Sequence, residues 1–215
     1  LATSHGRTVP MRAYLNTIAP GVAQGEIVVE GVPLAVHLEC DAPRWRQALW
    51  YDRRLMAGGS RLEFDSIRQT TLRPFGLIMR GPTDTGESIE LRMGFSLRGV
   101  DQAEANLYED CGSQAQCFDR RRVQTRTEWR DHLDGIVVEG GSSEQRTVFA
   151  TSLYHSLIKP CFAPDESPFW STSRSFVFDI ATMWDIYKTQ LPLMTAIAPQ
   201  RAVELVSALL SVREE

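Results

Sequence analysis

The sequence predicts an α+β protein in which a β-rich part precedes a helical part. Two observations carry this prediction: apolar residues alternate with polar ones before Val100, and they recur at helical spacing after it. With 215 residues and 43% hydrophobic composition, the chain is long enough to bury the core of one or two domains.

Short strands are expected wherever the alternation holds, with turns at glycine pairs such as Gly58-Gly59 between them. Several short alternating strands with polar turns are typical of a β-sandwich, so we expect a sandwich at the N-terminus. The alternating residues are Ile27, Val29, Val32, Leu34, Val36 and Leu38; Leu62 and Phe64; Phe75 to Met79; and Ile89, Leu91, Met93 and Phe95.

The apolar period changes between Val100 and Leu133, where it fits two helical segments around a loop that contains cysteine. Arginine and acidic residues are mixed on the second segment, which is typical of a solvated helix face rather than a binding patch. A short strand, Ile136-Val137-Val138, is expected next.

The domain boundary is expected near Gly140-Gly141. Residues 1–140 then form a β-sandwich domain with short helices, and residues 141–215 form the incomplete beginning of a helical domain. Ser142, with Gln145 three residues later, has the form of a capping box that opens this helical domain.

The helix that begins at Ser142 is expected to end before Pro160. A second helical segment is expected from Met183 to Ala198, where Pro192 must kink the helix or end its first half. Pro199 is well placed to open a final helix. Its apolar stripe has no further helix to cover it, which is typical of a truncated bundle or helical barrel. The stripe consists of Ala202, Leu205, Val206, Leu209 and Val212.

Composition excludes several partners. The net charge of −4 provides no basic surface for nucleic acid, and no apolar run approaches the roughly 20 residues needed to span a bilayer. The chain contains no basic-then-apolar leader, so no signal peptide is expected in it and its compartment stays open.

The cysteines show no Cys-x-x-Cys spacing, so no metal ligands are assigned to this chain. Cys111 and Cys117 bracket a short polar loop, and a disulfide between them in an oxidising compartment is one interpretation. Separate, partly buried thiols at Cys40, Cys111, Cys117 and Cys161 are the other. Motifs for a nucleophilic serine, Gly-x-Ser-x-Gly, and for phosphate binding, Gly-x-x-x-x-Gly-Lys, are also missing from the sequence.

Four fragments in the same order resemble the mannosidases of glycoside hydrolase family 92. They resemble the end of that family's N-terminal domain, its first barrel helix with a Leu-Tyr-His step before a proline, its Trp-Asp signature, and the Pro-Leu run that follows. The fragments are Phe95-Ser96 through Val100-Asp101-Gln102-Ala103 and Asn106-Leu107 with Trp129 and Leu133; Thr147 to Leu157 with Pro160; Met183-Trp184-Asp185-Ile186-Tyr187-Lys188; and Leu191-Pro192-Leu193 with Pro199.

The resemblance implies an N-terminal β-sandwich (supersandwich) followed by the first helices of an (α/α)₆ barrel. It also implies a calcium-dependent, inverting exo-α-mannosidase that hydrolyses terminal α-mannosides of glycans and is secreted or periplasmic. The family's general acid, general base and main calcium ligands are expected beyond Glu215. The chain by itself is therefore expected to contain no catalytic residue and to be inactive.

The resemblance also implies that Asp185 and Lys188 bind hydroxyls of the terminal mannose. Residues three apart share a helical face, and a carboxylate accepts hydroxyl protons while a cation donates. The family usually has arginine where this chain has Lys188, which replaces a bidentate fork by a point charge. The alternative for Asp185 is a carboxylate that the helix dipole favours.

Two tryptophans are further candidates for substrate binding, because indole faces stack on sugar rings. Large aromatic side chains are more often part of the core, and that is the expectation for Trp184, whereas both interpretations stay open for Trp170. Two other functions are retained: a glycoside phosphorylase of the same architecture, and a non-catalytic carbohydrate-binding or interaction module.

Overall fold

The computed structural model describes residues 11–29, 31–42, 44–65, 73–82, 88–112, 117–170, 174–180 and 183–213. The chain divides into two compact units, here called the β unit (Leu1–Asp119) and the helical unit (Arg120–Glu215). The domain boundary near Gly140 stays a prediction. None of the helices in the described ranges is both long and apolar enough to cross a membrane.

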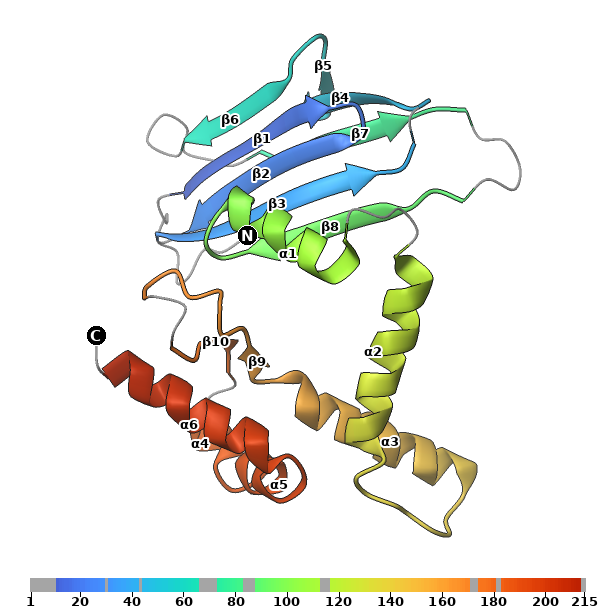
Figure 1. Ribbon diagram of the computed structural model, residues 1–215, viewed down its shortest axis with the longest axis vertical. Helices are drawn as coiled ribbons and strands as arrows, with labels where there is room; N and C mark the ends of the chain where they lie inside the picture. Colours follow the sequence, from blue (N-terminus) through green and yellow to red (C-terminus); the bar gives the residue numbers. More distant parts are fainter. Residues whose placement is uncertain are drawn as a thin grey trace. The chain divides into compact units, whose positions relative to one another are not determined.

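The larger sheet of the β unit has five strands in the order β6-β1-β2-β3-β8, and all neighbours are antiparallel (Figure 1). Tight turns join β1 to β2 and β2 to β3, and Gly21 and Gly31 adopt positive φ angles of 79° and 85° there. The strands are β1 (Met11–Ala19), β2 (Val22–Val29), β3 (Val32–Cys40), β6 (Arg61–Asp65) and β8 (Leu91–Ser96).

A second antiparallel sheet has the strand order β5-β4-β7. Leu49 on its central strand is fully buried. The side chain of Gln47 ties this strand to the β1–β2 turn, because its Nε2 donates to the carbonyl of Ala19 at 2.6 Å and its Oε1 accepts from the N–H of Gly21 at 3.0 Å. The strands are β4 (Arg46–Tyr51), β5 (Arg54–Met56) and β7 (Phe75–Arg80).

Helix α1 (Val100–Cys111) lies across one face of the larger sheet, over β3 and β8 (Figure 1). It buries Ala103 and Leu107 against that face. The close approach requires a glycine on β8: a Cβ at Gly94 would lie 1.9 Å from the carbonyl oxygen of Ala103. The opposite face is apolar and exposed along β3 and β8, at Leu34, Leu91, Met93 and Phe95.

The helical unit contains most of the remaining helices and one small ribbon. Ser142 caps α3 with its hydroxyl while the Gln145 side chain accepts from the Ser142 N–H, so the predicted capping box is confirmed. Helices α5 and α6 pack on each other. The elements are α2 (Phe118–Leu133), α3 (Ser143–Ile158), β9 (Cys161–Phe162), β10 (Val177–Asp179), α4 (Met183–Ile186), α5 (Gln190–Ile197) and α6 (Pro199–Arg213).

The predicted α+β organisation, antiparallel sheets followed by helices, is confirmed. The predicted strand Ile136-Val137-Val138 is wrong. A strand needs a neighbour to satisfy its backbone, and here Ile136 and Val138 instead line a pocket of about 460 Å³ with side chains of α2 and α3. The helix predicted from Met183 to Ala198 is split into α4 and α5, and its first half ends before Pro192 as expected.

Candidate functional site

The predicted sugar-binding residues Trp184 and Asp185 lie on α4, and Lys188 lies just after it. Ile186 is buried and anchors this segment, while its neighbours face solvent. Trp184 is 76% exposed, so the expectation that it belongs to the core is wrong. In a helix this short, burying Ile186 turns the preceding residues outward.

Asp185 and Lys188 are both exposed and are carried by one tight turn. The N–H of Tyr187 donates to the carbonyl of Met183 at 3.1 Å, and the N–H of Thr189 donates to that of Ile186 at 3.1 Å. The ammonium of Lys188 lies 5.3 Å from the centroid of the Tyr187 ring. A cation and a carboxylate therefore stand three residues apart on a surface turn, open to a polar ligand.

Pro192 accounts for this turn. Proline has no N–H to donate to the carbonyl four residues earlier, and its ring collides with that carbonyl in a continuous helix. The carbonyl concerned belongs to Lys188, so a helix cannot run through from Met183. Pro192 lies in the first turn of α5, where its missing N–H has no helical partner to lose.

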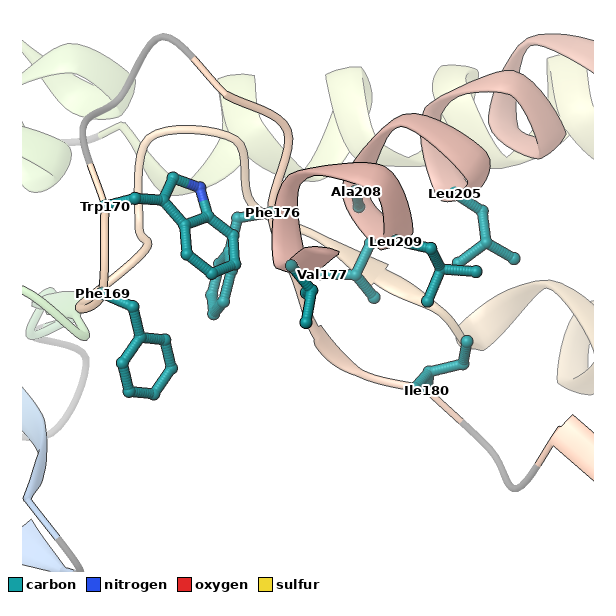
Figure 2. A pocket seen from close by; sticks show the side chains of 9 residues that line it. Phe169, Trp170, Phe176, Val177, Ile180, Leu205, Ala208 and Leu209 are labelled. Carbon is teal, nitrogen blue, oxygen red and sulfur yellow. The ribbon is translucent and has the colours of Figure 1, made fainter. Parts of the chain in front are cut away.

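Trp170 lies in a different place, at an apolar pocket of about 620 Å³ (Figure 2). Its ring meets Phe176 edge-on at 5.5 Å, and its backbone N–H donates to the hydroxyl of Ser167. The indole Nε1 is buried and has no partner within the described part of the chain. The pocket is lined by Phe169, Trp170, Phe176, Val177, Ile180, Leu205, Ala208, Leu209 and Val212.

The four predicted residues therefore fall into two groups. Trp184, Asp185 and Lys188 share one exposed turn, and none of them lines the pocket of Trp170. Apolar side chains dominate that pocket, which offers a sugar little beyond aromatic surface.

A partly buried polar cluster beside α1 was not predicted from the sequence. Glu39 on β3 accepts hydrogen bonds from the hydroxyl of Tyr108 and the guanidinium of Arg92, both at 2.5 Å. His37 is 2% exposed; its Nδ1 accepts from Gln24 at 2.9 Å, which leaves its Nε2–H to donate to Glu39 at 3.3 Å. The only signal in the sequence is that polar residues alternate with apolar ones on β3.

The contacts within this cluster shift the pKa values of Glu39 and Tyr108. Burial acts to raise the pKa of Glu39, but the hydrogen bonds from Tyr108 and His37 and the charge of Arg92 outweigh it and lower that pKa. The hydrogen bond to Glu39, followed by burial, raises the pKa of Tyr108 to about 12. Tyr108 therefore stays a donor and Glu39 an acceptor at neutral pH. The cluster joins α1 to the sheet, and we assign it no catalytic role.

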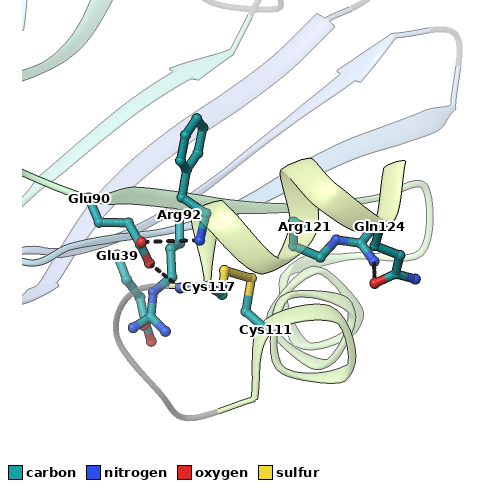
Figure 3. Close-up of a disulfide and its surroundings, with 8 residues drawn as sticks. Glu39, Glu90, Arg92, Cys111, Cys117, Arg121 and Gln124 are labelled. Atoms are coloured by element: carbon teal, nitrogen blue, oxygen red, sulfur yellow. Dashed lines mark hydrogen bonds and ion pairs between the residues drawn. A yellow bond between two sulfur atoms is a disulfide. The ribbon is translucent and has the colours of Figure 1, made fainter. Parts of the chain in front are cut away.

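A disulfide joins Cys111, at the end of α1, to Cys117, just before α2 (Figure 3). Of the two interpretations of these cysteines, the disulfide is the one found, while Cys40 and Cys161 are free. Glu90 also binds the start of α2, because its two carboxylate oxygens accept hydrogen bonds from the N–H groups of Cys117 and Phe118 at 3.1 and 3.2 Å. A carboxylate at the first turn of α2 is favourably placed in the helix dipole.

Calcium is the metal that the family resemblance implies. Calcium requires about six to eight oxygen ligands, largely from carboxylates and carbonyls. Over the ranges that the structure describes, no three His, Cys, Asp or Glu side chains come together as a metal-binding group. The described residues therefore offer no cluster of carboxylate side chains that could hold calcium.

The family model of the glycosyl hydrolase family 92 catalytic domain matches residues 102–215, which is more than half of the chain. The chain belongs to glycoside hydrolase family 92. The match includes the turn with Trp184, Asp185 and Lys188, so the family resemblance drawn from the sequence is confirmed.

A relative in Arthroderma benhamiae, named an uncharacterized secreted glycosidase, is 28% identical over 127 residues. That alignment covers 58% of this chain and 16% of the relative.

Solved family 92 structures share the fold. An inverting family 92 mannosidase from Bacteroides thetaiotaomicron VPI-5482 matches with a TM-score of 0.69 at 18% identity, over 86% of this chain and 26% of that protein. The family 92 glycosyl hydrolase ccman5 also matches with a TM-score of 0.69, at 19% identity, over 93% of this chain and 27% of that protein. The chain thus spans about a quarter of the length of these structures.

Proposed function

We propose that this chain is part of a calcium-dependent, inverting exo-α-mannosidase that removes terminal α-mannose from glycans. The observation that carries the proposal is the family 92 match over residues 102–215. Further support comes from the similar structures, which include an inverting mannosidase and an α-mannosidase from Bacteroides thetaiotaomicron in complex with mannoimidazole.

In this proposal, the turn between α4 and α5 forms part of the mannose subsite. The carboxylate of Asp185 accepts hydrogen bonds from sugar hydroxyls, and the ammonium of Lys188 donates to sugar oxygens. The exposed ring of Trp184 offers an apolar face to the pyranose. Trp170, whose ring lies among apolar side chains, is not part of this subsite.

The catalytic carboxylates are assigned to sequence outside residues 1–215. Inversion needs a general acid and a general base about 6.5–9.5 Å apart, with a water between the base and the sugar. Calcium, when bound, would supply positive charge that draws sugar hydroxyls into place, and its ligands are assigned outside this chain too. The contribution of residues 1–215 is then to bind and orient the terminal mannose.

A secreted location is part of the proposal. The Arthroderma benhamiae relative is named a secreted glycosidase, and an oxidising environment suits the disulfide between Cys111 and Cys117.

The test is mannose release from α-mannosyl disaccharides by a longer protein that contains residues 1–215, with calcium or with a chelator. We expect release that requires calcium, and a β-anomeric first product by NMR. Asp185→Asn is expected to reduce kcat/KM about 100-fold or more, since it leaves sugar hydroxyls unpaired. Asp131→Asn, at an exposed position on α2, serves as the matched control. Release of a sugar phosphate only when inorganic phosphate is added would instead indicate a phosphorylase.

A further inference from the structure

Among the described residues, the turn that carries Asp185 and Lys188 has local hydrogen bonds only: besides the two backbone bonds given above, the hydroxyl of Thr189 donates to the carbonyl of Asp185 at 3.3 Å. Helix α4 has four residues, and Pro192 prevents a continuous helical ladder into α5. These bonds shape the turn but do not orient it against its surroundings, so its orientation depends on contacts with other elements of the helical unit.

Gln190 provides such a contact directly after the turn. Its Nε2 donates to the carbonyl of Ser156 at 2.6 Å and to the carbonyl of Lys159 at 2.7 Å. Both acceptors lie at the C-terminal end of α3, where the last carbonyls of a helix have no partner within it. A glutamine amide has two N–H groups, so one side chain satisfies two such carbonyls.

Apolar packing alone does not fix the orientation of the turn. Ile186 is buried and sets how deeply the turn sits, but apolar contact has no preferred direction. The two hydrogen bonds of Gln190 are directional and converge from one nitrogen, so they set the angle at which α5 leaves the turn. Arg201 holds the next helix in a similar way, donating to the carbonyl of Pro160 at 2.9 Å.

We propose that Gln190 is a positioning residue of the mannose subsite: its two hydrogen bonds to the end of α3 hold the turn so that Asp185 and Lys188 face the ligand together. This inference rests on the proposed function. Glutamate cannot replace Gln190, because an ionised carboxylate has no proton to donate to two carbonyls.

The first test is hydrogen exchange on the 215-residue chain and its Gln190→Leu variant. We expect the amides of residues 184–189 to exchange about tenfold faster in the variant, since two hydrogen bonds contribute on the order of one tenfold factor in opening. Amides of α6 are expected to keep their rate. Gln200→Leu, at an exposed position on α6, is the matched control and should change neither segment. Unchanged exchange in 184–189, or an equal increase throughout α6, would overturn the proposal.

The second test is titration, in the presence of calcium, of a longer protein that contains residues 1–215 with methyl α-D-mannopyranoside. We expect Gln190→Leu to weaken binding by about tenfold or more, Gln190→Glu to weaken it as well, and Gln200→Leu to leave it unchanged. Binding by Gln190→Leu as tight as that of the longer protein with its native residues would overturn the proposal. If the longer protein with its native residues does not bind the mannoside in the presence of calcium while exchange responds locally to Gln190→Leu, the proposed function of Asp185 and Lys188 fails and the structural anchor by Gln190 stands.

Discussion

Helix α1 of the β unit and helix α6 of the helical unit are of similar length but are buried very differently. The buried side of α1 meets a sheet that this chain supplies, and the polar groups beside it are paired around Glu39. Helix α6 buries Leu205, Ala208 and Ser211 but leaves much of its apolar surface exposed. Its exposed apolar residues are Val203, Val206, Leu209, Leu210 and Val212.

This difference shows which helix has its apolar side covered by other residues of this chain. Where α1 meets the sheet, Ala103 and Leu107 are buried, and Glu39 is paired with Tyr108 and Arg92. The helical unit presents exposed apolar side chains of the kind that other polypeptide normally covers. The matched part of this chain covers 26% and 27% of two solved relatives, which are therefore more than three times as long as this chain. Substitutions under α1 should therefore destabilise the chain, and substitutions on the open side of α6 should not.

The largest effect is expected from Gly94→Ala. The added methyl group would lie 1.9 Å from the backbone oxygen of Ala103, so α1 must shift off the sheet, at a cost of about 3 kcal/mol or more. Urea unfolding and amide exchange in α1 measure this cost. Gly59→Ala is the control, because its methyl group meets only Met56, at 3.5 Å. Equal stability of the two variants would contradict the close packing of α1.

A somewhat smaller effect is expected from Glu39→Gln, which removes the charge that Tyr108, His37 and Arg92 share. We expect a loss of about 2–3 kcal/mol at pH 7. Glu63→Gln is the control, since its carboxylate is exposed and its ion pair with Arg61 contributes about 0–1 kcal/mol.

The pH dependence sharpens the same prediction. The pKa of Glu39 is lowered on folding, so its contribution to stability is fully present above its ordinary value of 4.5 and is lost as the pH falls through the lowered value. Unfolding curves below pH 4.5 should therefore converge for the unmodified chain and Glu39→Gln. A difference that stays constant down to pH 2 would show that the charge of Glu39 is not what the cluster uses.

The smallest effect is expected from Val206→Thr on the open side of α6. The side chain is exposed, so its polarity should change the free energy of unfolding by less than about 0.5 kcal/mol. Leu205→Ala, one residue earlier and buried, should cost about 2–3 kcal/mol. Thermal unfolding of both variants compares them directly. A large loss from Val206→Thr would mean that this chain already covers that side of α6.

Local patterns in the sequence were sufficient for most elements. Alternation predicted β2, β3, β6, β7 and β8, and the Ser142–Gln145 capping box marked the start of α3. Strands β1, β4, β5, β9 and β10 were missed. In β1 and β4, alanine, arginine and asparagine dilute the alternation, and the other three have only two or three residues each. The order of the four resembling fragments was enough to identify the family.

The order of the β-rich and helical parts, the family, and a kink or break of the helix at Pro192 could all be predicted from the sequence. These features depend on local periodicity, on one residue's covalent geometry or on motif order. Only the tertiary structure decided that Trp184 is exposed, that Glu39 is paired beside α1, and that Gln190 reaches the end of α3. Each of these depends on which distant segment occupies the space beside a side chain, and residue spacing does not specify that neighbour.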